Sequence, residues 1–187
     1  VDYLQRELPS LLELRIARLQ FKALKRRLSR SDLDVLIETE ADKILSLVDQ
    51  CRLERRGERV LIKRVRGLED SSRFWSVYMT LDHLQIVQNS IVKIIRLLTH
   101  DKARALQPVS TADVKPNASA GDESVAAFSE SVRLFKDTVD AIPSLKTTLR
   151  HAHPWFGPLD ASGWHALVAM HLQIHRVQVE RILAGLA

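Results

Sequence analysis

Apolar residues recur at intervals of three and four along most of the chain, which is the period of a helix and not of a strand. Four segments carry such a stripe, and they begin near residues 31, 76, 123 and 161. Glycine and proline, six of each, seldom interrupt the stripes. The pattern predicts an all-α fold in which these helices form a four-helix bundle over residues 31–187.

The first of these four helices should begin at Ser31, because Asp34 three residues later can complete a capping box. We expect it to end at about Cys51. Residues 52–74 contain several arginines and two glycines, which predicts a connection with one short extended piece at residues 60–62.

Ser76 and Asp160 stand directly before apolar series, so they are the predicted N-caps of the second and last bundle helices. We expect the helix after Ser76 to end near His100 and the last helix to cover residues 161–185. Residues 151–158, just before the last helix, are predicted to be a loop.

The third bundle helix has the longest regular stripe, which runs from Val125 to Leu149. Pro143 should kink this helix or briefly break it. The preceding residues 101–122 are polar and contain Pro, Ala and Ser, which predicts a mobile crossover loop.

Residues 8–29 predict a further helix of a different kind. Pro9 suits a helix start, and the apolar residues lie on nearly every side of the axis between cations. Residues 1–30 hold eight Lys or Arg and three Asp or Glu, whereas the remaining chain holds 20 of each sign. We therefore expect residues 1–30 to be an additional N-terminal basic helix, an arm appended to a neutral bundle domain at residues 31–187.

Composition narrows the class of protein. A single cysteine excludes an internal disulfide and a cysteine-based zinc knuckle. No window approaches the length of a membrane span and no signal peptide opens the chain, so we expect a cytoplasmic protein. The chain begins at Val1 and not at methionine, so the question whether a segment precedes it stays open. A core of this size folds without a metal, so a metal would serve function.

The predicted last helix carries the clearest candidate chemistry. His171 and His175 lie one turn apart in the middle of its apolar face, a spacing that lets two imidazoles share one metal ion. Hydrogen-bonded core histidines would show the same spacing, so a third ligand is needed to distinguish the two interpretations. The candidates for that ligand are the other histidines: His83, His100, His151, His153 and His165.

His83 is the best placed of these candidates. It lies two turns inside the helix that follows Ser76, on the flank of the apolar stripe, whereas His165 projects off its stripe and His100 sits at a helix end. Three histidines from two helices would leave a coordination position open for water or substrate, as in reactive metal sites.

Several of these residues fall in motifs that resemble those of the DinB/YfiT-like family. Trp75-Ser76 followed by His83-Leu84 is similar to a W-S-x6-H-L signature. The segment from His153 to Leu159, with Trp164 and the pair His171-x3-His175, resembles the closing motif of the family. The resemblance covers residues 31–187, and the basic arm has no counterpart in it.

The resemblance implies a four-helix bundle that binds a divalent metal ion through His83, His171 and His175, with Zn, Ni, Fe and Mn all left open. Some members of the family are thiol-dependent S-transferases or isomerases. It therefore implies a metal-dependent transferase or hydrolase whose small-molecule substrate is a low-molecular-weight thiol. Relatives often carry Glu at the position of Met79, where it would complete a capping box with Ser76; this departure does not touch the ligand set.

Other polar residues are predicted to be structural. Glu40 projects onto an apolar stripe, where an ion pair with a bundle arginine is favoured over a hydrogen bond to a ligand imidazole. Cys51, on the same stripe, is interpreted as a small buried hydrophobe and not as a nucleophile. For His151 and His153, which flank a loop, a contact with substrate and a loop-fixing hydrogen bond both stay open.

The competing hypothesis is a non-catalytic metal-binding or interaction protein. In that case the basic arm at residues 1–30 would bind a membrane surface, nucleic acid or a partner chain. Under either hypothesis the apolar residues of the arm need a support, which can be a groove of its own bundle, a second chain as in a homodimer, or an anionic membrane surface. Aromatic residues make up 5% of the chain, with no stacking series among the cations, which disfavours sequence-specific binding of nucleic acid.

Limited proteolysis should cleave within residues 101–122 before it cleaves any bundle helix, because this segment has few apolar residues to anchor it. Mass spectrometry of the first fragments checks the prediction. An earlier cut inside a bundle helix would contradict the predicted helix boundaries.

Overall fold

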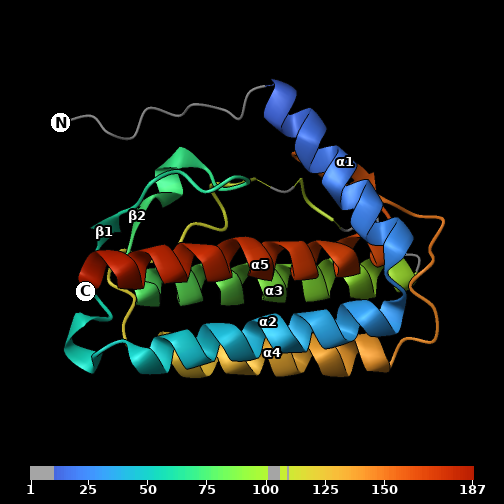
Figure 1. Cartoon of the computed structure of the whole chain (residues 1–187). Coiled ribbons are helices and arrows are strands. Elements are labelled where there is room, and N and C mark those ends of the chain that lie inside the picture. The colour runs from blue at the N-terminus through green and yellow to red at the C-terminus, as the bar shows by residue number, and fades with distance from the viewer. Residues whose placement is uncertain (1–10, 101–105, 109) are drawn as a thin grey trace.

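The computed structural model describes residues 11–100, 106–108 and 110–187. Four helices, α2 to α5, lie side by side as a bundle, and α1 crosses α5 on the outside (Figure 1). The helices span Leu11–Arg27 (α1), Arg30–Gln50 (α2), Val77–Thr99 (α3), Glu123–Asp140 (α4) and Ala161–Leu186 (α5). The predicted bundle with an additional N-terminal helix is confirmed, and the predicted beginning of that helix at residue 8 lies outside the described residues.

Short elements fill the connections between the helices. Between α2 and α3, strand β1 (Val60–Leu61) pairs antiparallel with β2 (Phe74–Trp75), flanked by the single-turn helices η1 (Leu53–Arg55) and η2 (Asp70–Ser72). The extended piece predicted at residues 60–62 therefore exists, and its partner is the segment directly before α3.

The prediction of a plain loop at residues 151–158 is wrong. Strand β3 (His151–His153) pairs with β4 (Gly157–Leu159) to form a hairpin between α4 and α5. Gly157 closes the turn with a φ of 72°, a backbone conformation that glycine adopts at little cost. Two strands of three residues are too short to show an alternating pattern, so the sequence gives little sign of them.

Helix α2 begins at Arg30, and its N-cap is Ser29 and not Ser31 as predicted. The Ser29 hydroxyl accepts a hydrogen bond from the Asp32 backbone, and the Asp32 carboxylate accepts one from the Ser29 backbone at 2.8 Å. Asp34 is not available for capping because it pairs with His165 of α5, at 2.7 Å. The capping box therefore forms between Ser29 and Asp32, and Asp34 serves a tertiary contact.

Helix α4 ends at Asp140, so the predicted continuation to Leu149 with a kink at Pro143 is wrong. Proline disfavours helical backbone at the residue before it, which ends the helix ahead of Pro143. The guanidinium of Arg30 donates hydrogen bonds to the carbonyls of Val139, at 2.5 Å, and Ile142, at 2.8 Å. These bonds satisfy carbonyls that a longer helix would have used.

The other two predicted caps are confirmed. The Ser76 hydroxyl accepts the Met79 N–H at 3.1 Å, and the Asp160 carboxylate accepts the Gly163 N–H at 2.7 Å. Helix α3 ends at Thr99, next to the predicted His100, and α5 ends one residue beyond its predicted end.

The bundle core is built from large apolar side chains of all four helices. Ile44 comes from α2, Leu84 and Ile95 from α3, Phe135 from α4 and Leu172 from α5, and each is no more than 1% exposed. Each side chain of this kind stabilises the fold by roughly 1.5–3 kcal/mol through removal from water. Cys51 is buried with them, as predicted, and among the described residues no helix is both long and apolar enough to cross a membrane.

Glu40 forms the predicted ion pair inside this core. Its carboxylate accepts hydrogen bonds from Arg176 of α5 at 2.5 Å and from Lys43 at 2.9 Å. Burial alone would raise the pKa of Glu40, but the hydrogen bonds from Lys43 and Arg176 outweigh it and lower the pKa. The pair therefore links α2 to α5 with both charges compensated.

Helix α1 lies on its own bundle, which is one of the three supports expected for the arm. The ring of Phe21, 5% exposed, packs against Phe156 of the hairpin with ring centroids 4.7 Å apart. Arg18 donates to the backbone carbonyl of Trp155 at 2.7 Å, and Lys25 pairs with Asp160 at 3.4 Å. Phe21 is the apolar anchor of α1, and the ionic contacts orient the helix.

Replacing Phe21 with Ala should release α1 and leave the bundle folded, because the lost contacts join α1 to the hairpin. Truncation of a buried Phe costs about 3–5 kcal/mol. Hydrogen exchange should show faster exchange in α1 and unchanged exchange in α3 and α4. Leu19→Ala is the matched control, because Leu19 on the same helix is 67% exposed. Loss of protection throughout the bundle would show that α1 is part of the core.

Candidate metal centre

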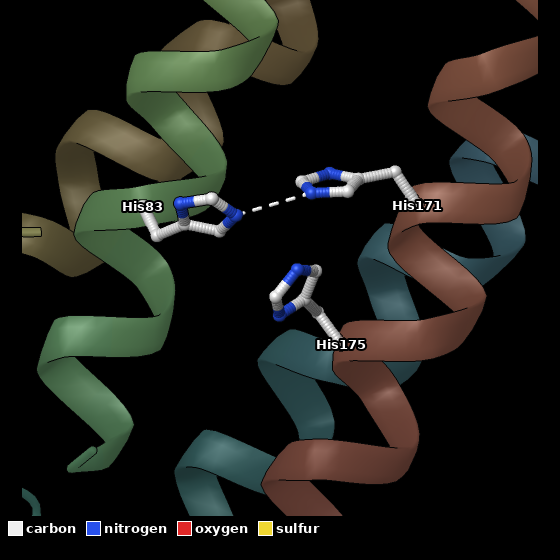
Figure 2. A group of neighbouring side chains, drawn as sticks. All are labelled: His83, His171 and His175. Atoms are coloured by element: carbon white, nitrogen blue, oxygen red, sulfur yellow. Dashed lines mark hydrogen bonds between the residues drawn. The ribbon is translucent and has the colours of Figure 1, made fainter. Parts of the chain in front are cut away.

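Three imidazole rings from two helices converge on one point in the bundle. His83 comes from α3, and His171 and His175 come from successive turns of α5 (Figure 2). One ring nitrogen of each lies within 4.8 Å of the other two, and the Nε2 atoms of His83 and His171 are 3.1 Å apart. The packing of α3 against α5 thus brings together the three histidines singled out in the sequence.

The spacing suits a shared ion. Two imidazole nitrogens 3.1 Å apart, each about 2.1 Å from a metal, would subtend an angle of roughly 95° at it. This angle lies close to that of octahedral coordination and within reach of tetrahedral coordination. The three residues could hold one divalent ion and leave further positions open.

The tautomer of His83 is set from outside the helices. Its Nδ1 lies 2.6 Å from the backbone carbonyl of Val114, an oxygen that can only accept, so Nδ1 carries the proton. The carboxylate of Asp82 holds that segment in place by accepting the Asn117 N–H at 2.7 Å. The Nε2 lone pair of neutral His83 consequently points at the centre of the cluster.

His175 is oriented by a second relay of the same kind. Gln178 donates from Nε2 to the carbonyl of Ser72 at 2.7 Å, so its Oε1 is the atom that faces Nδ1 of His175, at 2.6 Å. Oε1 can only accept, which places the His175 proton on Nδ1 and leaves Nε2 free to ligate. Hydrogen bonds of this kind to the outer nitrogen of a ligand histidine fix its ring and raise its basicity.

Burial keeps the three rings neutral. It lowers the pKa of His83 to about 4, against the opposing effects of the Val114 hydrogen bond and the Asp82 charge. Burial also lowers the pKa of His171 and of His175 well below the ordinary value, with repulsion between the imidazolium forms adding to it. A metal ion at neutral pH would therefore meet three neutral imidazoles, of which His83 and His175 present a lone pair at Nε2. The proton that His171 donates to Nε2 of His83 would have to leave that nitrogen when an ion binds.

Trp75 packs against two of the ligands. Its ring lies 5.1 Å from that of His83 and nearly parallel to that of His175, with centroids 6.3 Å apart. Ser76, the next residue, caps α3. Trp75 thus packs against two of the imidazoles, and Ser76 begins the helix that carries His83.

A cavity of about 870 Å³ opens beside the three histidines. Its walls come from α1, α3, α5, the hairpin and the connections before and after α3, and most of the lining is apolar. Among the lining side chains are Leu24 of α1, Ile91 of α3, Phe156 of the hairpin and Leu167 of α5. A volume of this size accommodates a small molecule.

The remaining histidines lie elsewhere. His100 is the exposed C-cap of α3. His165, off the stripe as predicted, is buried against Phe135 and pairs with Asp34 of α2. His151 packs on Trp164, with ring centroids 5.9 Å apart, and is absent from the cavity lining. His153 accepts the Trp155 N–H at 3.1 Å, the predicted loop-fixing hydrogen bond, and also lines the cavity.

Two supporting groups were missed in the sequence. Gln178 lies three residues after His175 on the same helix face, and that spacing was the available signal. The carbonyl of Val114 carries no signal, because every residue offers one and only the path of the chain brings this one to His83.

Comparison with known proteins agrees with this architecture. A family model of the DinB superfamily matches residues 37–179. The chain is similar in structure to TT2238, described as a four-helix bundle protein, with a TM-score of 0.59 and 16% identity over 81% of this chain and 98% of that one. At 16% identity, the similarity to TT2238 shows the fold alone. Among curated proteins none matches the chain.

Replacing Gln178 with Leu should weaken zinc binding by about 10-fold to 100-fold, because His175 loses the acceptor that orients it. Competition with a chromophoric chelator measures the affinity. Gln173→Leu is the matched control, since Gln173 lines the cavity on the same helix without a hydrogen bond to a ligand histidine among the described contacts. Equal zinc affinity in the Gln178 variant and the wild type would contradict the relay.

Proposed function

The chain belongs to the DinB superfamily, and on that premise we propose that it is a metal-dependent enzyme with one divalent ion held by His83, His171 and His175. One observation carries the proposal: three buried or half-buried neutral imidazoles converge on one point at the wall of a large cavity. A structural metal site is normally closed by a fourth protein ligand, whereas three protein ligands leave room for water or substrate.

The donor set fits such an ion. Two of the three rings have their outer nitrogen engaged by carbonyl oxygens, the arrangement found around histidine ligands of metals. Imidazole nitrogens suit Zn, Ni, Fe and Mn, and the ligand set alone does not choose among them. A bound ion would act as a Lewis acid and lower the pKa of a water or thiol, so that either becomes a nucleophile near neutral pH.

The cavity indicates the class of substrate. Its cationic lining exceeds its acidic lining: Arg64 is paired with Glu13 and Arg176 with Glu40, but Arg66 and Lys115 have no carboxylate partner among the described residues. An apolar cavity with uncompensated cations at its edge suits a small molecule that has an apolar part and an anionic group. A low-molecular-weight thiol with a carboxylate fits this description, and S-transfer is the reaction we propose.

The residues around the cavity would position the substrate for that reaction. Trp75 packs against two of the ligand rings, and mostly apolar side chains line the space beside them. Helix α1 supplies part of the wall through Ala17, Gln20 and Leu24. We therefore assign the basic arm to the substrate cavity of its own chain.

Changing both His171 and His175 to Ala should abolish binding of zinc and leave the helical circular dichroism unchanged, because the apolar core does not depend on the ion. Protein purified without a histidine tag is analysed for metal by mass spectrometry. His100→Ala is the control, since His100 is exposed at the end of α3, and it should keep one ion per chain. A content of one ion per chain in the double variant would contradict the proposal.

A second measurement separates an enzyme from a metal-binding protein without turnover. Metal-loaded protein is incubated with cysteine and chlorodinitrobenzene, whose carbon–chlorine bond breaks as the sulfur–carbon bond forms, and conjugation is followed by absorbance. Conjugation faster than with the double variant supports S-transfer. Retained metal without acceleration of this or other thiol transfers supports the non-catalytic alternative.

A further inference from the structure

We propose that His153 is a substrate-contacting residue of this cavity, which donates a hydrogen bond from Nε2–H to an acceptor group of the bound molecule. The inference rests on the proposed function, because it requires a ligand in the cavity beside the three histidines. It assigns to the hairpin a chemical role that differs from metal binding.

The hydrogen bond at the hairpin turn determines the tautomer. Nδ1 of His153 faces the backbone N–H of Trp155 at 3.1 Å. A backbone N–H can only donate, so Nδ1 must offer a lone pair and cannot carry a proton. The ring is therefore neutral with its proton on Nε2, since an imidazolium would place two protons against each other at this contact.

This tautomer is the reverse of the one found at the cluster. His83 and His175 carry the proton on Nδ1 and present a lone pair at Nε2. His153 presents a proton at Nε2, so it cannot ligate a metal through that atom while the Trp155 hydrogen bond persists. Among the histidines that line the cavity, His83 and His175 thus offer lone pairs at Nε2, and His153 offers an N–H donor from the hairpin.

The position of the ring suits a preorganised donor. It packs against Phe156, with centroids 5.1 Å apart, and edge-on to Trp164, at 5.5 Å. Its Nε2 has no hydrogen-bond partner among the residues that the structure describes, whereas Nε2 of His151 is enclosed in the protein interior. Burial lowers the pKa of His153 to about 4, which agrees with a neutral ring. An N–H that faces a mostly apolar cavity is a strong site for a carboxylate or thiolate of a ligand.

Two isosteric variants separate this role from a structural one. The amide of Asn can place an acceptor near Nδ1, so His153→Asn keeps the bond to Trp155 and loses the donor. The longer amide of Gln can place an N–H near Nε2, so His153→Gln keeps the donor and loses the turn bond. A purely structural role predicts that Asn is the better substitute. The proposed role predicts the reverse for ligand binding.

The probe is benzoate, which combines an apolar ring with a carboxylate acceptor. Titration calorimetry of zinc-loaded protein should give binding about tenfold weaker for His153→Asn than for the wild type, and near wild type for His153→Gln. Thermal unfolding should rank the two variants in the opposite order. Benzoate binding preserved in the Asn variant, or absent from the zinc-loaded wild type, would overturn the proposal.

A direct measurement tests the tautomer without a ligand. In protein with nitrogen-15 labelled histidine, long-range proton–nitrogen spectra should show His153 protonated on Nε2 and His83 and His175 protonated on Nδ1. A His153 proton on Nδ1 would overturn the inference. Both His153 variants should contain as much zinc as the wild type, because His153 is not one of the three ligands. Metal loss in the double variant of His171 and His175 therefore tests the proposed function independently of this inference.

Discussion

The packing of α3 against α5 is the contact on which the candidate site depends. It sets the imidazole of His83 opposite two imidazoles on successive turns of α5, with nitrogen atoms as close as 3.1 Å. Neutral rings can meet at that distance, whereas three imidazolium ions could not, and burial keeps these rings neutral. The bundle therefore gathers three neutral imidazoles at one point of its interior, and the surrounding apolar core supplies the driving force for this arrangement.

The connections between helices supply hydrogen-bond acceptors for the ligand histidines. The carbonyl oxygens within a helix already accept the hydrogen bonds of the helix itself. The acceptors for the ligand histidines come instead from Val114 and, through Gln178, from Ser72, both on connecting segments. The connections before and after α3 thus belong to the site, although their sequence resembles ordinary polar loops.

Helix α1 and the hairpin complete the cavity from the other side. Phe21 and Phe156 join the two elements, and Leu24 and His153 face the cavity from them. Arg27 of α1 then lines this mostly apolar space together with the three histidines. One arrangement thus brings the arm together with the hairpin and the histidine cluster, which the family resemblance already links in the sequence.

Local chemistry in the sequence determined the helices, the caps at Ser76 and Asp160, and the shared face of His171 and His175, because helical periodicity and capping act over a few residues. Only the tertiary structure decided the partner of Asp34, which is His165 of α5, and that of Arg30, which binds carbonyls at the end of α4. The tertiary structure also decided the pairing of the hairpin strands, the carbonyl that faces His83 and the position of α1 on the bundle. Each of these depends on the free energy of contacts between residues far apart in the chain, which no local pattern records.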